Sequence, residues 1–301
     1  MLDKKIQQVL LFNEKGKYIS KIHKIGKGPG EYQKIMDFFV DDNHHLNLLT
    51  GSEIFTYSMD GRYITKKGLP VFATHAIYFS DSLIAFKKSW SNYIEGATSI
   101  FETKIVISDI NFKEFDYSLR FDLRNYDAGP VDFPIVFSKS NESIYFFELF
   151  NDTIYKVSDN KMNPYCYFNF GSVRVPQEYY SLKRTELMAR LQEKQKRASS
   201  PHDYFDTGKY IFLIYFYDGN IIYVVQNTET GELNQAKAII NDLDNLPYNS
   251  PLSIHKGQLV YCLSALDVLA YQKQHKVSTS TLLLNLTENN NPLVVMVKLK
   301  N

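Results

Sequence analysis

Residues 8–22 read QVLLFNEKGKYISKI, and residues 53–67 read EIFTYSMDGRYITKK. In both stretches, residues with strand character flank a short polar segment that ends in glycine, which predicts strand, tight turn, strand. Glycine suits the turn because it adopts a positive φ at little steric cost. The two stretches match at a constant offset of 45 residues, which pairs Phe12 with Tyr57, Gly16 with Gly61, Tyr18 with Tyr63 and Ile19 with Ile64.

Weaker copies of this hairpin follow, with Asn111, Asn160 and Gly231 at the turns. The turns are therefore 45, 50, 49 and 71 residues apart. A period of 45 to 50 residues that contains several short strands is typical of the blades of a β-propeller. The composition agrees, because the 22 Tyr and 21 Phe favour strands. We therefore predict an all-β propeller with about four strands in each blade.

Two segments depart from this pattern. Residues 175–201 are rich in helix formers, begin with Pro176 and carry a rough apolar stripe at Leu182, Leu187 and Leu191. Residues 264–287 open with Ser264, a suitable N-cap. We expect one propeller domain over residues 1–301, with a helical insertion at about 175–201, a C-terminal helical region at about 264–287 and a final strand in NPLVVMVKLK.

Three stretches carry a family resemblance: KIGKGPGEY at residues 24–32, DFFVDDNHHLNLLT at 37–50 and IFTYSMDGRYI at 54–64. With them, the chain resembles the NHL-like six-bladed β-propeller proteins of Bacteroidetes over nearly its whole length. The resemblance implies six blades. It also implies a place outside the cytoplasm, in the periplasm or on the outer-membrane surface, because members are mostly exported lipoproteins. Their biochemical function is undetermined, so the resemblance supplies no catalytic residue.

The chain departs from the family pattern in two ways. Thr50 stands where the family usually has Asp, and Met1 falls within the first blade, where only strands near residues 6–12 and 17–23 are evident. Family members begin earlier, with a lipoprotein signal, so we expect the native protein to have further N-terminal residues. The alternative is a five-bladed ring, closed by pairing of the C-terminal strands with residues 6–12.

The stretch IGKGPGEY at residues 25–32 suggests a phosphate-binding loop, but its chemistry argues against one. Pro29 removes a backbone donor, Glu31 adds a negative charge, and a strand follows where an anion site needs a helix. We interpret the stretch as a tight connection between blades. Gly28 and Gly30 then allow unusual backbone angles, and Tyr32 packs between the blades as an anchor.

Few other residues are candidates for a site. Trp90, the single tryptophan, is the best candidate for a ligand contact, although packing between blades is the commoner role of such a residue. His75 is expected to be a packed core or channel residue. His44 and His45 are adjacent and would point to opposite faces of a strand, so one metal ion could not readily use both side chains. A polar hairpin turn with solvated Asp41 and Asp42 is the preferred interpretation.

The remaining features limit the function classes. The net charge of +1 favours neither nucleic acid nor an anionic membrane, and no run of residues is long and apolar enough for a membrane span. Cys166 and Cys262 lie in apolar surroundings and form no metal-ligand pattern, so free thiols are favoured over a disulfide.

Two function classes remain. The first is a monomeric, non-catalytic binding or scaffold propeller without a cofactor, for a glycan or a protein or peptide ligand. The second is a metal-assisted hydrolase or lactonase whose axial channel holds a divalent ion such as calcium. Carboxylates, amides and imidazoles from several blades would have to converge for the second class, and the sequence contains no catalytic motif that requires it.

Overall fold

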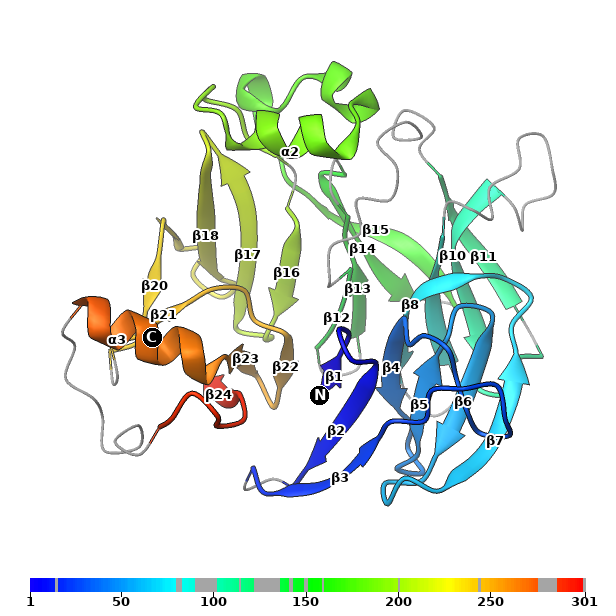
Figure 1. Cartoon of the computed structure of the whole chain (residues 1–301). Coiled ribbons are helices and arrows are strands. Elements are labelled where there is room, and N and C mark those ends of the chain that lie inside the picture. Colours follow the sequence, from blue (N-terminus) through cyan, green and yellow to red (C-terminus); the bar gives the residue numbers. More distant parts are fainter. Residues whose placement is uncertain are drawn as a thin grey trace. The chain divides into compact units, whose positions relative to one another are not determined.

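The chain folds into successive antiparallel sheets, shown in the computed structural model of Figure 1. The structure describes residues 1–13, 16–79, 83–89, 102–113, 115–121, 136–140, 143–148, 151–158, 160–199, 201–242, 245–275 and 286–299. Within them, six sheets of three or four strands follow one another, and in each sheet the strands are neighbours in chain order. This is the arrangement of propeller blades, so the predicted all-β, six-bladed propeller is confirmed. The chain divides into two compact units, Met1–Pro130 with Lys156–Asn163 and Val131–Tyr155 with Pro164–Asn301.

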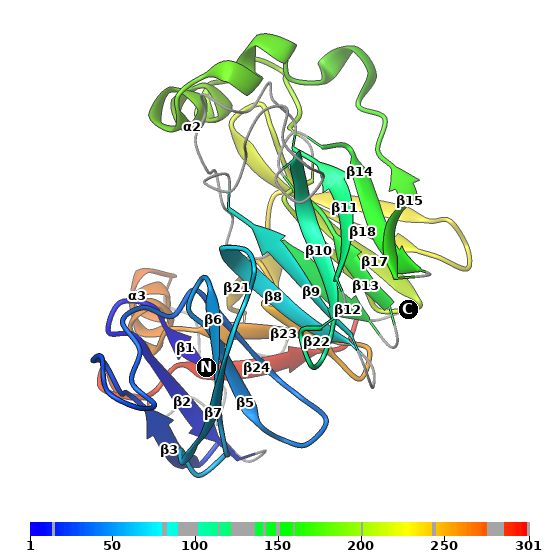
Figure 2. The same ribbon diagram turned by 90° about the vertical axis from the view of Figure 1, so that its right-hand side faces the viewer.

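The first unit contains three sheets, whose strands run side by side in Figures 1 and 2. In the first sheet, Leu2 and Asp3 form a strand beside Val9 and Gln8, one more strand than the two expected there. The strands are β1 (Leu2–Asp3), β2 (Gln8–Phe12) and β3 (Tyr18–Ile22); β4 (Asp37–Val40), β5 (Leu46–Leu49), β6 (Glu53–Tyr57) and β7 (Tyr63–Gly68); and β8 (Ala73–Phe79), β9 (Leu83–Lys88), β10 (Thr103–Asp109) and β11 (Phe115–Arg120).

The second unit contains most of the remaining strands, and the residues of β14 and β15 are divided between the two units. The final strand β24 pairs with β23, and not in the way that the five-bladed alternative requires. The strands are β12 (Phe137–Ser140), β13 (Ser143–Phe146), β14 (Thr153–Ser158) and β15 (Lys161–Tyr167); β16 (Asp203–Asp206), β17 (Tyr210–Tyr217), β18 (Asn220–Asn227) and β19 (Leu233–Ala236); the pair β20 (Ile239–Ile240) and β21 (Pro247–Tyr248); and β22 (Ser253–His255), β23 (Gln258–Leu263) and β24 (Leu293–Val297).

The two segments expected to be helical contain helices that are shorter than the segments. Pro176 precedes a 3-10 helix at Gln177–Ser181, and the α-helix α2 spans Arg184–Gln192. Val175, Tyr179, Leu187 and Leu191 are buried together, with Leu182 and Met188 packed beside them. Near the C-terminus, α3 spans Ala265–His275; residues 276–285 of the expected helical region lie outside the described residues, and Thr287 and Asn290 form a turn.

The 45-residue repeat is confirmed in the hydrogen bonds of two hairpins. In β2–β3, Asn13 N donates to Lys17 O and Gly16 N donates to Asn13 O, both at 2.9 Å. The β6–β7 hairpin repeats these bonds 45 residues later, with Ser58, Arg62 and Gly61 in the same roles and the same distances. Both turn glycines have a positive φ, +74° and +88°, and both hairpins have a register shift just before the equivalent aromatic residues, Phe12 and Tyr57.

One apolar core joins the first two sheets of the first unit. Its buried members come from both sheets and from the connection between them: Val9, Leu11, Ile22, Tyr32, Ile35, Leu46, Leu48, Phe55 and Tyr57. Burial of each large side chain of this kind contributes about 1.5–3 kcal/mol. The connection over residues 24–36 is therefore held against this core, and the candidate site lies beside it.

Candidate functional site

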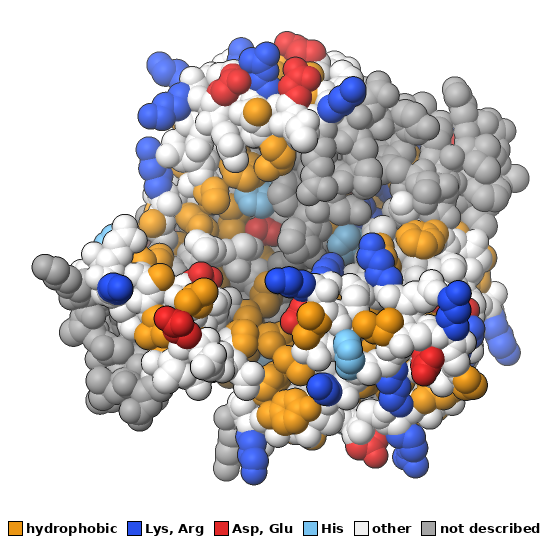
Figure 3. Space-filling view, viewed as in Figure 1, with side chains coloured by type: hydrophobic (Ala, Val, Ile, Leu, Met, Phe, Trp, Pro, Cys, Tyr) orange, Lys and Arg blue, Asp and Glu red, His pale blue; other side chains and the backbone are white. Residues whose placement is uncertain are grey.

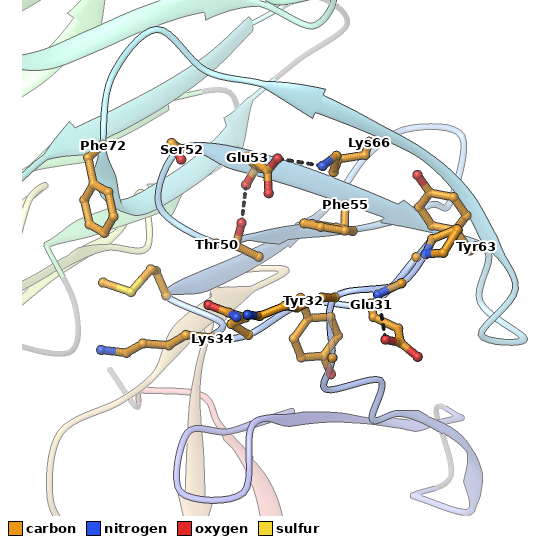
Figure 4. Close-up of a pocket in the computed structure, with 17 residues that line it drawn as sticks. Glu31, Tyr32, Lys34, Thr50, Ser52, Glu53, Phe55, Tyr63, Lys66 and Phe72 are labelled. Carbon is orange, nitrogen blue, oxygen red and sulfur yellow. Dashed lines mark hydrogen bonds and ion pairs between the residues drawn. The ribbon is translucent and has the colours of Figure 1, made fainter.

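A hollow of about 700 Å³ lies wholly within the first unit, and we call it the groove. One wall consists of residues 26–34 and Met36, and the other of Thr50, Ser52, Glu53, Phe55, Tyr63, Lys66 and Phe72. Figure 4 shows the first wall below and β6 and β7 above it. A volume of this size is within the usual range for small-molecule sites in proteins, and the lining combines aromatic with charged and hydroxyl side chains. The groove is therefore the candidate functional site.

Tyr32 anchors the wall formed by residues 26–34 and Met36, called the lower wall, to the first sheet. Its side chain is 1% exposed, and its ring packs edge-on against Phe55 of β6 with centroids 6.4 Å apart. The phenol oxygen lies 3.0 Å from Gln7 O and 3.2 Å from Ile22 O, which share its proton, and it accepts from Lys24 N at 3.3 Å. Burial raises the pKa of Tyr32, as expected for a phenol that stays neutral. The tyrosine thus connects the first sheet to the second.

The loop over residues 26–32, called the glycine loop below, provides its own anion. The carboxylate of Glu31 accepts a hydrogen bond from Gly28 N at 2.8 Å, and Glu31 N donates to Gly28 O at 3.0 Å. Gly26 N donates to Tyr32 O, and Tyr32 N donates to Lys24 O. These bonds occupy the N–H groups of Gly26, Gly28, Glu31 and Tyr32, which a bound phosphate would otherwise use.

The two glycines expected to have unusual backbone angles differ. Gly30 has a φ of +72°, whereas Gly28 lies outside the positive-φ region. The expectation for Gly28 is therefore wrong in its reason. A Cβ at Gly28 would come within 3.1 Å of the Glu31 carboxylate, so close approach of that side chain, and not backbone strain, explains the glycine.

The upper wall presents an ion pair over an aromatic ring. Phe55 and Lys66 are cross-strand partners in β6 and β7, so their side chains share a face of the sheet. Lys66 Nζ lies 2.7 Å from Glu53 Oε1 and 5.5 Å from the centroid of the Phe55 ring. The hydrogen bond that Lys66 donates to the Glu53 carboxylate raises the pKa of Lys66. Both charged groups are about half exposed and accessible to a ligand.

Thr50 shapes the turn that precedes β6. Its backbone N–H and its hydroxyl both donate to Glu53 O, at 2.9 Å and 3.1 Å. Thr50 thus lines the groove and closes the turn over residues 50–53. Ser52, in the same turn, is exposed.

Two aromatic rings, Tyr63 and Phe72, lie at opposite ends of the groove in Figure 4, and each packs against a glycine. A Cβ at Gly30 would lie 2.6 Å from Tyr63 Cγ, and a Cβ at Gly51 would lie 2.4 Å from Phe72 Cε2. Both glycines have a positive φ, +72° and +100°. Gly51 O also accepts from Ala73 N at 2.9 Å, which holds the two backbones together beside Phe72. The lack of a side chain at residues 30 and 51 thus determines where the two rings lie.

The described residues among the other candidates, His75, His44 and His45, do not line the groove. Trp90 falls outside the described residues. His75 is buried on β8, with Thr74 Oγ1 3.0 Å from its Nδ1, in keeping with a packed residue. His44 and His45 form the turn between β4 and β5, where His44 has a φ of +57°.

Of the acidic residues of that turn, Asp42 is exposed, as expected, and Asp41 is partly buried, and both accept hydrogen bonds. Tyr78 donates to Asp42 Oδ2 at 2.6 Å, and desolvation with this bond raises the pKa of Tyr78 to about 12. Asp41 accepts from His45 N and from the Asn47 side chain. Cys166 and Cys262 are both free thiols, and burial raises the pKa of Cys166 to about 11.

A buried polar cluster in the second unit lies at β16. Ser250 Oγ donates to Asp203 Oδ2 at 2.6 Å, and His202 Nε2 lies 3.7 Å from the same oxygen. Burial raises the pKa of Asp203 to about 7 and lowers the pKa of His202 to about 4. Among the residues that the structure describes, no group of three or more His, Cys, Asp or Glu is arranged to hold a metal ion. The cluster is a buried group whose two pKa values are shifted in opposite directions.

The surface and the helices add two observations. On the face shown in Figure 3, basic and acidic side chains are interspersed over the α2 region, where Arg190 pairs with Glu193 at 3.3 Å. No helix in the described part of the chain is long and apolar enough to cross a membrane.

The sequence analysis singled out the stretch that forms one wall of the groove, but as a structural connection and not as part of a site. It did not single out Ser52, Glu53, Phe55, Lys66 and Phe72 of the other wall, nor Gly51 beneath Phe72. Glu53 and Lys66 are 13 residues apart, and only the hairpin register could have paired them. Phe72 and Gly51 belong to two separate connections, and no local sequence signal joins them.

Comparisons with known proteins give a family and a fold. A family model described as Domain of unknown function (DUF4934) matches residues 1–298. No curated protein sequence matches the chain. The crystal structure of a Bacteroides fragilis protein predicted to be exported is similar over 100% of this chain and 87% of that chain, with a TM-score of 0.77 and 18% identity. This identity supports the shared fold and nothing further.

Two other solved structures are more distant. The extracellular domain of a predicted hybrid two-component system from Bacteroides thetaiotaomicron has a TM-score of 0.44 at 12% identity, over 84% of this chain and 30% of that chain. An auxiliary nutrient binding protein from Bacteroides ovatus has a TM-score of 0.38 at 12% identity, over 75% of this chain and 54% of that chain. At these scores they carry no argument about the site.

Proposed function

The chain belongs to the DUF4934 family, and we propose that it is a non-catalytic binding propeller that acts outside the cytoplasm, with the groove as its ligand site. The single observation that carries the proposal is the pair of aromatic rings on glycines, Tyr63 on Gly30 and Phe72 on Gly51, at the two ends of one hollow. Rigidly placed aromatic rings offer a large contact area at a low entropic cost, which favours recognition of a ligand.

The location proposed for the chain is the periplasm or the outer-membrane surface. Support comes from the fold shared with a Bacteroides fragilis protein predicted to be exported, and from the resemblance to NHL-like lipoproteins. We propose a monomer that needs no cofactor and binds a glycan or a peptide, and not nucleic acid. The nearly balanced charge of the chain supports the last point.

The groove has the composition of a binding site more than that of a catalytic one. Glu53 is paired with Lys66, and Glu31 is bonded to the glycine loop, so neither carboxylate is positioned as an isolated acid or base. Catalysis by a metal-assisted hydrolase would instead need several ligands that converge on one ion.

A binding screen with matched variants tests the proposal. The purified chain is applied to glycan and peptide arrays with calcium and with a chelator, alongside Phe72→Ala and Tyr167→Ala. Phe72 is 39% exposed in the groove, and Tyr167 is an exposed aromatic residue on β15. We expect Phe72→Ala to lose the signal at least tenfold and Tyr167→Ala to keep it. Equal binding by all three proteins would contradict the groove as the site, and turnover of a ligand only with calcium would favour the hydrolase.

A further inference from the structure

The walls of the groove, and not only its volume, indicate which ligand it takes. Tyr63 and Phe72 lie at its two ends, and the polar groups of Thr50, Ser52, Glu53 and Lys66 lie between them in Figure 4. A suitable ligand is therefore elongated, has apolar faces at both ends and carries many hydroxyl groups along its middle. A short oligosaccharide has these properties, because the C–H face of a pyranose ring packs on an aromatic face and its hydroxyls both donate and accept.

The ion pair on the upper wall suits sugar hydroxyls. Glu53 provides acceptor oxygens and Lys66 provides donor hydrogens, with Glu53 Oε1 2.7 Å from Lys66 Nζ. Both side chains lie on the same face as Phe55. A vicinal diol can donate one hydroxyl to the carboxylate and accept from the ammonium with the other. Because the pair is about half exposed, a ligand can add these bonds without breaking the existing one.

The charges that remain favour an acidic ligand. The lining contains three lysines, Lys27, Lys34 and Lys66, and two glutamates. Both glutamates are engaged, Glu53 with Lys66 and Glu31 with Gly28 N. Lys34 is exposed and, within the described residues, has no ion pair; in Figure 4 it extends along the lower wall toward the end where Phe72 lies. A carboxylate at that end would meet an ammonium group with no competing acid.

The backbone of the lower wall argues against an extended peptide. A peptide that binds by strand addition needs free N–H and C=O groups along the wall. Here the N–H groups of Gly26, Gly28, Glu31 and Tyr32 are all bonded within residues 24–32. Strand addition along these residues would therefore compete with bonds that the wall already makes.

On the basis of the proposed function, we infer that the groove binds a short oligosaccharide that contains a uronic acid. The terminal sugar rings pack on Tyr63 and Phe72, and the carboxylate lies at Lys34. The expected specificity is a preference for the acidic oligosaccharide over its neutral counterpart.

Calorimetric titrations of the full chain test this inference with three probes of equal length: a trigalacturonate, the neutral galactose trimer with the same linkage and triglutamate. The wild type is expected to bind trigalacturonate at least tenfold more tightly than the neutral trimer. Lys34→Gln is expected to remove that preference by weakening the binding of trigalacturonate at least tenfold. Lys21→Gln, which removes an exposed lysine on β3, is the matched control and should behave as the wild type.

The outcomes separate this inference from the proposed function. Equal binding of both sugars, with both weakened by Phe72→Ala, would overturn the acidic preference and leave the groove as the site. Binding of triglutamate alone would overturn the sugar inference in favour of a peptide. Failure of both sugars to bind would overturn the inference, and an array ligand whose binding ignores Phe72→Ala would overturn the proposed function as well.

Discussion

Gly51 and Phe72 are in contact through the space where a side chain at residue 51 would lie. The added Cβ would be 2.4 Å from Phe72 Cε2, and the φ of +100° at Gly51 is one that residues with a side chain rarely adopt. The position of the ring therefore depends on a backbone feature 21 residues earlier in the chain. This relationship can be tested without knowledge of the ligand.

Gly51→Ala is expected to lower the free energy of unfolding by about 2–4 kcal/mol, since the strained φ costs about 1–3 kcal/mol and the displaced ring adds to it. Urea unfolding followed by fluorescence measures the change. Gly68→Ala is the control, because a Cβ there meets nothing within 4 Å, and it should alter stability by less than about 0.5 kcal/mol. Similar losses for the two variants would contradict the close contact.

Gly30→Ala and Gly16→Ala separate the cost of contact from the cost of φ. The two residues have nearly equal φ values, +72° and +74°, but only Gly30 has a neighbour, Tyr63, within 4 Å of the added Cβ. Gly16→Ala should cost about 1 kcal/mol, the usual penalty of the left-handed region. Gly30→Ala should cost about 1–3 kcal/mol more in the same urea titration. A difference below about 0.5 kcal/mol would show that Tyr63 moves aside freely.

Tyr32→Phe removes the hydroxyl that bonds to the carbonyls of Gln7 and Ile22 and leaves the ring in the core. The loss should be about 1–2 kcal/mol, because buried carbonyl groups lose their partner. Tyr18→Phe, at a tyrosine that is 47% exposed, should be nearly neutral. Hydrogen exchange at residues 24–35 should also quicken only in Tyr32→Phe. Unchanged exchange there would contradict the anchoring role.

The opposite pKa shifts of Asp203 and His202 predict that their effects on the pH dependence of folding stability largely offset each other. The raised pKa of Asp203, about 7, contributes stability at low pH that is lost as pH rises from about 4 to 7. The lowered pKa of His202, about 4, has the opposite sign and contributes stability that is gained as pH rises from about 4 to 6.5. Between about pH 4 and 6.5 the two effects should largely cancel.

Single variants should reveal each half of the pair in urea unfolding measured from pH 4 to 8. Relative to the wild type, His202→Gln should lose stability with rising pH, by up to about 1.4 kcal/mol per pH unit between pH 4 and 6.5. Asp203→Asn should gain stability relative to the wild type over the same range. Profiles parallel to that of the wild type would show that the two groups titrate with ordinary pKa values.

The fold could be predicted from the sequence because its signal is local and repeated. The glycines at residues 16 and 61 end the turns of two equivalent hairpins, and each hairpin is specified within about 15 residues. The strand β1 could not be predicted, because Leu2–Asp3 is too short to show alternation. It is held by pairing with β2 and by a hydrogen bond from the Met1 amino group to Leu10 O.

The groove could be predicted only in part, for a physical reason. Tyr32 was recognised because its loop has an unusual local composition. Phe72 is an ordinary residue in its own segment, and its role arises from contact with Gly51 in another connection. Contacts between connections depend on how the sheets pack, and a single sequence does not encode that in any fixed spacing.

The carboxylate of Glu31 gives the glycine loop a built-in counterion. The three glycines of the loop resemble those of a nucleotide-binding loop, although here the Glu31 carboxylate already occupies the N–H group of Gly28. The acidic residue three positions after the donor Gly28 is the feature that distinguishes the two cases. A chain of this fold without that acidic residue would have a free N–H group at the position of Gly28, which could then bind an external anion.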